Sequence, residues 1–173
     1  RGLSTEQYRV FRGLLLEWIN ADGKTMLGEW CLFQTVRHFL DPEFVGARPA
    51  RPKHKSLTAV ADDLAIVLGT MAYLTAEDTS RAFNRGSAML ELPLQLPVVS
   101  AITLTHFSDA IENLAECYPL LKVAVLKAVA LVAADDGVIS NIEMTLVKAM
   151  AATMDCPEPD AMLEANDIRR TVV

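Results

Sequence analysis

The residues of this chain best suited to chemistry are two short acidic motifs that share one spacing. Each motif is Asp-Gly followed, after five intervening residues, by Glu: Asp22-Gly23…Glu29 and Asp136-Gly137…Glu143. Carboxylate oxygens are the ligands that hard divalent cations such as calcium and magnesium prefer. If the two copies pack as a pseudo-symmetric pair, their carboxylates form one acidic cluster, with Asp135 beside it, that could hold a single cation. The predicted metal ligands are Asp22, Glu29, Asp136 and Glu143.

Each motif also resembles the second half of an EF-hand loop, in which Gly occupies position 6 and a bidentate Glu occupies position 12. In that register position 1 is Trp18 in the first copy and Val132 in the second, and neither side chain can coordinate calcium. Position 3 of the second copy is Ala134, so this loop offers too few oxygens for an ion that takes about six to eight. The register therefore argues against an EF-hand.

The same acidic residues also have a structural role open to them. Ser140, followed three residues later by Glu143, is a capping box, in which each side chain accepts a hydrogen bond from the other residue's backbone N–H at the start of a helix. A carboxylate there also complements the positive end of the helix dipole. In the first copy Met26 stands at the serine position, but Glu29 can still serve the first turn. Capping is favoured, and cation binding stays open beside it.

Other features of the sequence argue against several classes of function. The three histidines are far apart and do not form a zinc-binding spacing, and no nucleophile-elbow, Walker or GxGxxG motif occurs. A formal net charge of −6 argues against a nucleic-acid binder, which is normally basic. The three cysteines are widely spaced and are predicted to be reduced, buried thiols. The basic loop 48–55 could contact acidic lipid head groups or an acidic partner, although an ordinary solvated loop is favoured.

Helical periodicity surrounds the first motif. Ser4 with Gln7 is a capping box that predicts the start of a helix. The apolar residues of this helix recur on one face: Phe11, Leu14, Leu15, Trp18 and Ile19. Asp22-Gly23 predicts its end, because glycine adopts the left-handed conformation found there. A second helix is predicted from Leu27 to Leu40, stopped by Pro42.

The rest of the chain also predicts helices. A third helix starts near Ser56, with Asp62 and Asp63 facing solvent. Further helices are predicted to end near Leu92, to run over 105–118 and to run over 120–134, the last as a central core helix. The final helix follows Ser140 and has one apolar face: Ile142, Leu146, Val147, Met150 and Met154. Aligning the two motifs matches four of these positions with the first unit: Leu32 with Leu146, Phe33 with Val147, Val36 with Met150 and Leu40 with Met154.

These patterns predict an all-α fold, a compact bundle of about seven helices with two pseudo-symmetric helix hairpins. We expect a single domain over residues 1–173. Its predicted parts are repeat units at about 4–42 and 119–157, a helical middle at 56–118 and a frayed tail at 160–173.

Longer motifs give the chain a family resemblance. The second unit contains Ala134-Asp135-Asp136-Gly137, Ser140, Glu143, Leu146, Met150 and the ending Cys156-Pro157-x-Pro159. In this it resembles the TerB-like (tellurite-resistance-B-like) helical domain. Upstream motifs extend the match: Phe11-Arg12, Ala21-Asp22-Gly23, Glu29-Trp30, Phe39-Leu40-Asp41-Pro42 and Arg81-Ala82-Phe83-x-Arg85-Gly86. With them, the span from about Leu3 to Pro159 resembles the C-terminal, non-catalytic region of bacterial HtpX-like membrane-bound zinc metallopeptidases.

This resemblance implies a longer parent protein, with a peptidase domain, transmembrane helices and zinc held by His-Glu-x-x-His. The present chain would then be a non-catalytic regulatory or protein-interaction domain on the cytoplasmic side of the inner membrane. It would need no cofactor of its own, and its partner would be a protein or a substrate of the parent peptidase. Nucleic acid is not expected, and membrane contact is expected only through the rest of the parent or weakly through loop 48–55.

A second function remains open at this point. The chain could be a free-standing TerB-like stress-response protein that binds a divalent cation. Its ligands would be the same four residues: Asp22, Glu29, Asp136 and Glu143.

Overall fold

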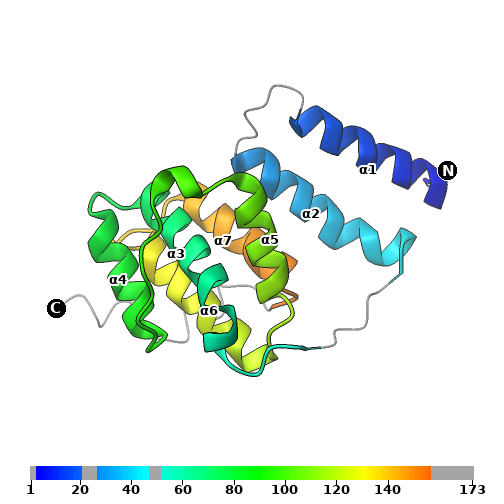
Figure 1. Ribbon diagram of the computed structural model, residues 1–173. Helices are drawn as coiled ribbons and strands as arrows, with labels where there is room; N and C mark the ends of the chain where they lie inside the picture. The colour runs from blue at the N-terminus through cyan, green and yellow to red at the C-terminus, as the bar shows by residue number, and fades with distance from the viewer. Residues whose placement is uncertain (1–2, 21–26, 47–51, 157–173) are drawn as a thin grey trace. The chain divides into compact units, whose positions relative to one another are not determined.

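The computed structural model describes residues 3–20, 27–46 and 52–156, and the structural statements below concern these residues (Figure 1). They form seven α-helices and two short 3-10 helices, with no strand and one isolated β-bridge between His54 and Cys117. The predicted all-α fold is therefore confirmed. The chain divides into two compact units, residues 1–50 and 51–173, which are described separately. Its organisation as one domain stays a prediction.

The first unit contains α1 (Thr5–Asn20) and α2 (Leu27–Phe44), which pack against each other. The capping box predicted at the start of α1 is present. The backbone N–H of Gln7 donates to Ser4 Oγ at 3.2 Å, and the backbone N–H of Ser4 donates to Gln7 Oε1 at 2.9 Å. The turn at Asp22-Gly23 lies outside the described residues, so the pseudo-symmetry of the two hairpins stays a prediction.

The end of α2 differs from the prediction, because the helix continues past Pro42 instead of stopping at Leu40. Pro42 has no backbone N–H, so α2 continues past this position without the hydrogen bond that another residue would donate there. The helix ends at Phe44, and Gly46 follows it with a left-handed φ of +91°. The N–H groups of Val45 and Gly46 both donate to the carbonyl oxygen of Asp41, at 2.8 Å and 3.1 Å. The stop signal is therefore the glycine, not the proline.

A small polar network joins α1 to α2. Tyr8 is fully buried and stacks on Phe44, with 4.8 Å between the ring centroids. Its hydroxyl donates to Asp41 Oδ1 at 2.7 Å, and the Arg12 and Arg37 guanidinium groups lie 3.1 Å and 3.5 Å from the same carboxylate. Burial by itself raises the pKa of Asp41, but the hydrogen bond from Tyr8 and the two positive charges outweigh it and hold the pKa below its ordinary value.

The second unit contains five α-helices. They are α3 (Ala61–Thr75), α4 (Thr79–Met89), α5 (Leu104–Leu114), α6 (Pro119–Ala133) and α7 (Asn141–Thr153), with 3-10 turns at Leu57–Val60 and Val99–Ala101. Helix α3 packs against α4, α5 and α6, α4 also packs on α6, and α7 packs on α5 and α6 (Figure 1). Four apolar residues of α3 are completely buried: Leu64, Val67, Leu68 and Met71. Helix α6 lines the same core, as predicted.

Glycine lets α4 and α6 approach closely. A Cβ atom added to Gly86 would lie 2.6 Å from Cγ2 of Val132 on α6 and 3.4 Å from Leu68 on α3. No other residue fits there without displacing its neighbours. The close approach holds α4 beside the end of α6, where the second acidic motif begins.

Several helix details differ from the prediction. Helix α4 ends at Met89 rather than near Leu92, because Glu91 adopts a left-handed φ of +54° and closes the helix. Helix α5 covers Leu104–Leu114 rather than 105–118, because the chain turns after Leu114 and Cys117 joins the β-bridge with His54. On α7, Leu146, Val147, Met150 and Met154 are buried as predicted, but Ile142 is 81% exposed.

One stretch of the described chain, Leu57–Thr75, is long and apolar enough to cross a membrane. Only its length and composition support that possibility. The same stretch packs against three helices, and a core helix passes the same test.

Candidate functional site

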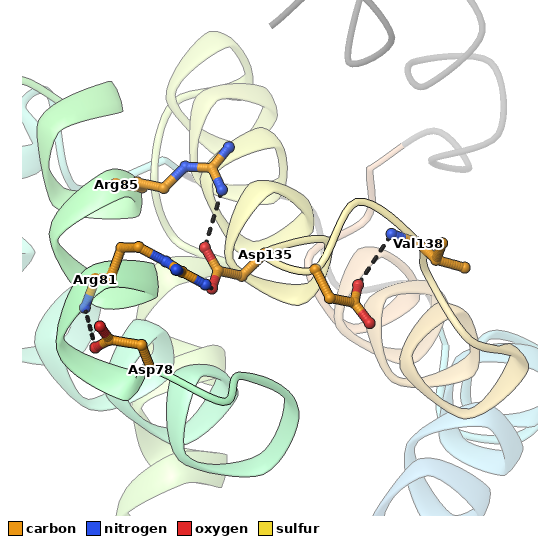
Figure 2. Close-up of polar contacts among 6 residues, drawn as sticks. Asp78, Arg81, Arg85, Asp135 and Val138 are labelled. Carbon is orange, nitrogen blue, oxygen red and sulfur yellow. Dashed lines mark hydrogen bonds and ion pairs between the residues drawn. The ribbon is translucent and has the colours of Figure 1, made fainter. Parts of the chain in front are cut away.

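The second acidic motif lies in the turn between α6 and α7. Gly137 has a φ of +87°, which favours glycine there. The Asp136 carboxylate accepts a hydrogen bond from the backbone N–H of Val138 at 2.9 Å, which forms an Asx turn (Figure 2). Asp136 therefore shapes the turn.

The other carboxylate of this motif caps α7. Glu143 donates its backbone N–H to Ser140 Oγ at 3.3 Å, and its Oε2 accepts the backbone N–H of Ser140 at 2.7 Å. The predicted capping box is confirmed. It satisfies two backbone donors that the start of a helix otherwise leaves unbonded.

Asp135, the neighbour of this motif, is held by two arginines of α4. Its side chain is 2% exposed, and its Oδ2 lies 2.6 Å from Arg81 Nη2 while its Oδ1 lies 2.9 Å from Arg85 Nη1. Figure 2 shows both guanidinium groups turned toward this carboxylate from one side of α4. The hydrogen bond from Arg81 is the main reason that the pKa of Asp135 is lowered, and Arg85 adds to it against the opposing effect of burial.

This arginine pair was not predicted as part of the site. Arg81 and Arg85 are four residues apart, the spacing that places side chains on one side of a helix, so the sequence predicts that the two arginines lie together. It does not predict that they meet Asp135, because this depends on the packing of α4 against α6 through Gly86 and Val132. The backbone N–H of Arg81 also donates to the N-cap residue Asp78 at 2.9 Å, which fixes the start of α4.

The four predicted metal ligands fall in two different units. Asp136 and Glu143 lie in the α6–α7 turn, Glu29 lies half-buried in the first turn of α2, and Asp22 lies outside the described residues. Across the described ranges, no three His, Cys, Asp or Glu residues are grouped so that they could hold a metal ion. The cation site stays a prediction.

A second polar network was missed, and it corrects the placement of Asp63. This residue was predicted to face solvent, but it is half-buried and its Oδ2 accepts a hydrogen bond from Asn113 Nδ2 at 2.5 Å. Asn113 Oδ1 lies 3.0 Å from His54 Nε2. Burial raises the pKa of Asp63, against the opposing effect of the Asn113 hydrogen bond. Because an amide links the imidazole to the carboxylate, this network positions the 52–55 segment and does not provide an acid–base pair.

The first unit presents an exposed apolar stripe, formed by Leu3, which lies two residues before α1, and by Val10, Phe11 and Leu14 on α1. Their exposed fractions are 52%, 54%, 42% and 59%. Phe11 and Leu14 belong to the apolar face predicted for this helix, and both are exposed. The side of α1 that packs on α2 carries Tyr8 and Arg12 instead. The periodicity identified an apolar face but could not identify which face meets the neighbouring helix.

The chain was compared with protein-family models, with curated proteins and with solved structures, and nothing matches it. The TerB-like resemblance and the parent peptidase therefore stay predictions.

Proposed function

We propose that this chain is a non-catalytic regulatory or protein-interaction domain of a membrane-anchored zinc metallopeptidase. In this proposal it acts by docking a partner or substrate of the peptidase, and the zinc and the chemistry belong to the parent protein. This parent protein is proposed because the motifs between Leu3 and Pro159 resemble the C-terminal region of HtpX-like peptidases.

The observation that carries the docking role is the exposed stripe on α1. Val10 and Leu14 are four residues apart, so they follow one line along the helix, with Phe11 beside it and Leu3 two residues before the helix begins. An amphipathic helix that shows an apolar line of this spacing is a common recognition element for another helix or an apolar groove. Clustered exposed apolar side chains also mark interaction surfaces more often than scattered ones do.

The repeat adds support for this surface. Leu146 on α7 is 3% exposed, whereas Leu32, its counterpart on α2, is 48% exposed. The face that the second copy buries in its own core is thus partly open in the first copy. Phe39, one heptad beyond Leu32, is 67% exposed on the same side of α2.

Cation binding, the alternative function, would require the described carboxylates to weaken hydrogen bonds that they already accept. Asp136 and Glu143 each accept a backbone hydrogen bond, and a metal ion would compete with both contacts. Hydrogen bonds that involve a charged group contribute about 1.5 to 3 kcal/mol each, so the turn resists such a change.

The docking role can be tested in the complete parent protein. We expect Leu14→Asp to change which folded substrates are cleaved while cleavage of a short unstructured peptide stays the same, because the stripe is remote from the chemistry. Arg9→Gln is the control, since Arg9 is an exposed residue of α1 outside the stripe. Unchanged substrate choice in Leu14→Asp, or a reading frame without an upstream His-Glu-x-x-His, would refute the proposal.

The cation alternative needs a separate measurement on the chain itself. Thermal unfolding with calcium, magnesium, manganese and zinc added one at a time should leave the Tm unchanged if the carboxylates are purely structural. A rise in Tm that Glu143→Gln removes, while an exposed-site variant such as Asp62→Asn keeps it, would favour the alternative.

A further inference from the structure

The start of α6 carries an apolar tip that no element of the described second unit covers. Leu120, the second residue of the helix, is 85% exposed, the largest fraction among the large apolar side chains that the structure describes. Tyr118, just before the helix, is 40% exposed. The tip therefore combines one protruding aliphatic side chain with one aromatic ring that bears a hydroxyl group.

Two lysines flank this tip. The backbone N–H of Tyr118 donates to the carbonyl oxygen of His54 at 3.1 Å, so the 52–55 segment lies against the start of α6. Lys53 and Lys55 stand on either side of His54 and both are exposed. The Lys53 ammonium lies 2.7 Å from Glu116, with 65% of the lysine side chain exposed. The positive charge beside the tip thus comes from Lys55 and, shared with Glu116, from Lys53.

We propose that this surface, consisting of Leu120, Tyr118, Lys53 and Lys55, binds the head-group region of an anionic membrane. Leucine is suited to enter the boundary between head groups and acyl chains, and tyrosine is enriched at that depth. The lysines supply attraction to acidic lipids, which acts within about 10 Å of the membrane surface at moderate salt. The surface belongs to the second unit, and the inference is independent of the docking role proposed for α1.

The shape and charge of the tip favour a lipid surface over a protein. A stable protein interface buries roughly 800 Å² on each partner, whereas this tip is one leucine and one tyrosine beside a segment that carries two lysines. Ile142 provides the contrast within the same chain. It is also the second residue of its helix and is 81% exposed, but its neighbour is Glu143 and no lysine flanks it in sequence until Lys148.

Vesicle co-sedimentation of the full chain tests the proposal. The vesicles contain either phosphatidylcholine alone or phosphatidylcholine with about 30% phosphatidylglycerol, which raises the surface charge to which lysines respond. We expect at least about fivefold stronger binding to the anionic vesicles, because each lysine near such a surface contributes close to that factor. Lys55→Gln should lower the anionic binding about fivefold, and Leu120→Gln should lower binding to both kinds of vesicle.

Ile142→Gln is the matched control and should bind as the wild type does. The Tm of each variant checks that folding is intact, which exposed positions should preserve. Equal binding to neutral and anionic vesicles would overturn the proposal. Equal loss in Leu120→Gln and Ile142→Gln would also overturn it. Binding that depends on Lys55 but not on Leu120 would assign the surface to acidic partners in general and reject the lipid assignment.

Discussion

At the scale of single residues, adjacent carboxylates in one turn have different roles. Asp135 forms ion pairs with both Arg81 and Arg85, while the Asp136 carboxylate accepts a hydrogen bond from the backbone N–H of Val138. The side chains of successive residues leave the backbone in different directions, so neighbours in sequence meet different surroundings. Each of these two carboxylates therefore has its own partner, two arginines for Asp135 and a backbone N–H for Asp136.

Replacing Asp135 by Asn tests how much its ion pairs contribute. The variant keeps the size of the side chain but removes the charge that faces both arginines; because the arginines are partly exposed, we expect the free energy of unfolding to fall by only about 1 kcal/mol. Asp62→Asn is the control, because Asp62 is exposed on α3 and should change the free energy by less than about 0.5 kcal/mol. Urea unfolding measures both values, and equal midpoints for the two variants would show that the arginine contacts contribute little.

At the scale of helices, close packing depends on where glycine is placed. Gly86 on α4 faces Val132 and Leu68, whereas a Cβ atom at Gly13 on α1 would meet nothing within 4 Å. The same substitution should therefore have opposite effects at the two positions. One glycine permits a helix contact, and the other only weakens a helix.

We expect Gly86→Ala to lower the free energy of unfolding by about 2 kcal/mol, because the added methyl group overlaps Val132. Gly13→Ala should raise the stability of α1 by about 0.5 to 1 kcal/mol, since alanine loses less backbone entropy in a helix. Amide hydrogen exchange can locate each effect, in α4 and α6 for the first and in α1 for the second. Faster exchange of α1 in Gly13→Ala would contradict the second expectation.

The helices themselves follow from local signals, and the faces that they bury do not. Capping boxes at Ser4 and Ser140 and the apolar run of α6 predicted helix starts and type correctly, because each signal acts within one or two turns. Phe11 and Ile142 belong to the predicted apolar faces of their helices, yet both are exposed. Periodicity gives one apolar face, but burial depends on which helix arrives there. The site follows the same division, since the capping role of Glu143 is local and the pairing of Asp135 with α4 is not.

At the scale of the whole molecule, we expect the free energy of unfolding to depend on pH in the acid range, because three carboxylates have shifted pKa values. Asp41 in the first unit and Asp135 in the second both have lowered pKa values, so both are ionised more readily in the folded than in the unfolded chain. The folded protein then binds fewer protons near pH 4, and its stability falls as the pH falls through the folded pKa values. Asp63 acts in the opposite direction, because its raised pKa favours the folded state at low pH, and this contribution is lost as the pH rises.

The pH dependence of urea unfolding between about pH 2 and 6 can separate these contributions, since each lowered pKa adds to the slope on the acid side. Wild-type protein should lose stability steadily below about pH 5. Asp41→Asn and Asp135→Asn should each be less stable at pH 6 and each show a shallower acid slope, and the double variant should show the shallowest slope. Asp63→Asn should steepen the slope, because it removes the group with the opposite sign. If the Asp135→Asn slope matched the wild type, the ion pairs with Arg81 and Arg85 would not be what holds this carboxylate ionised.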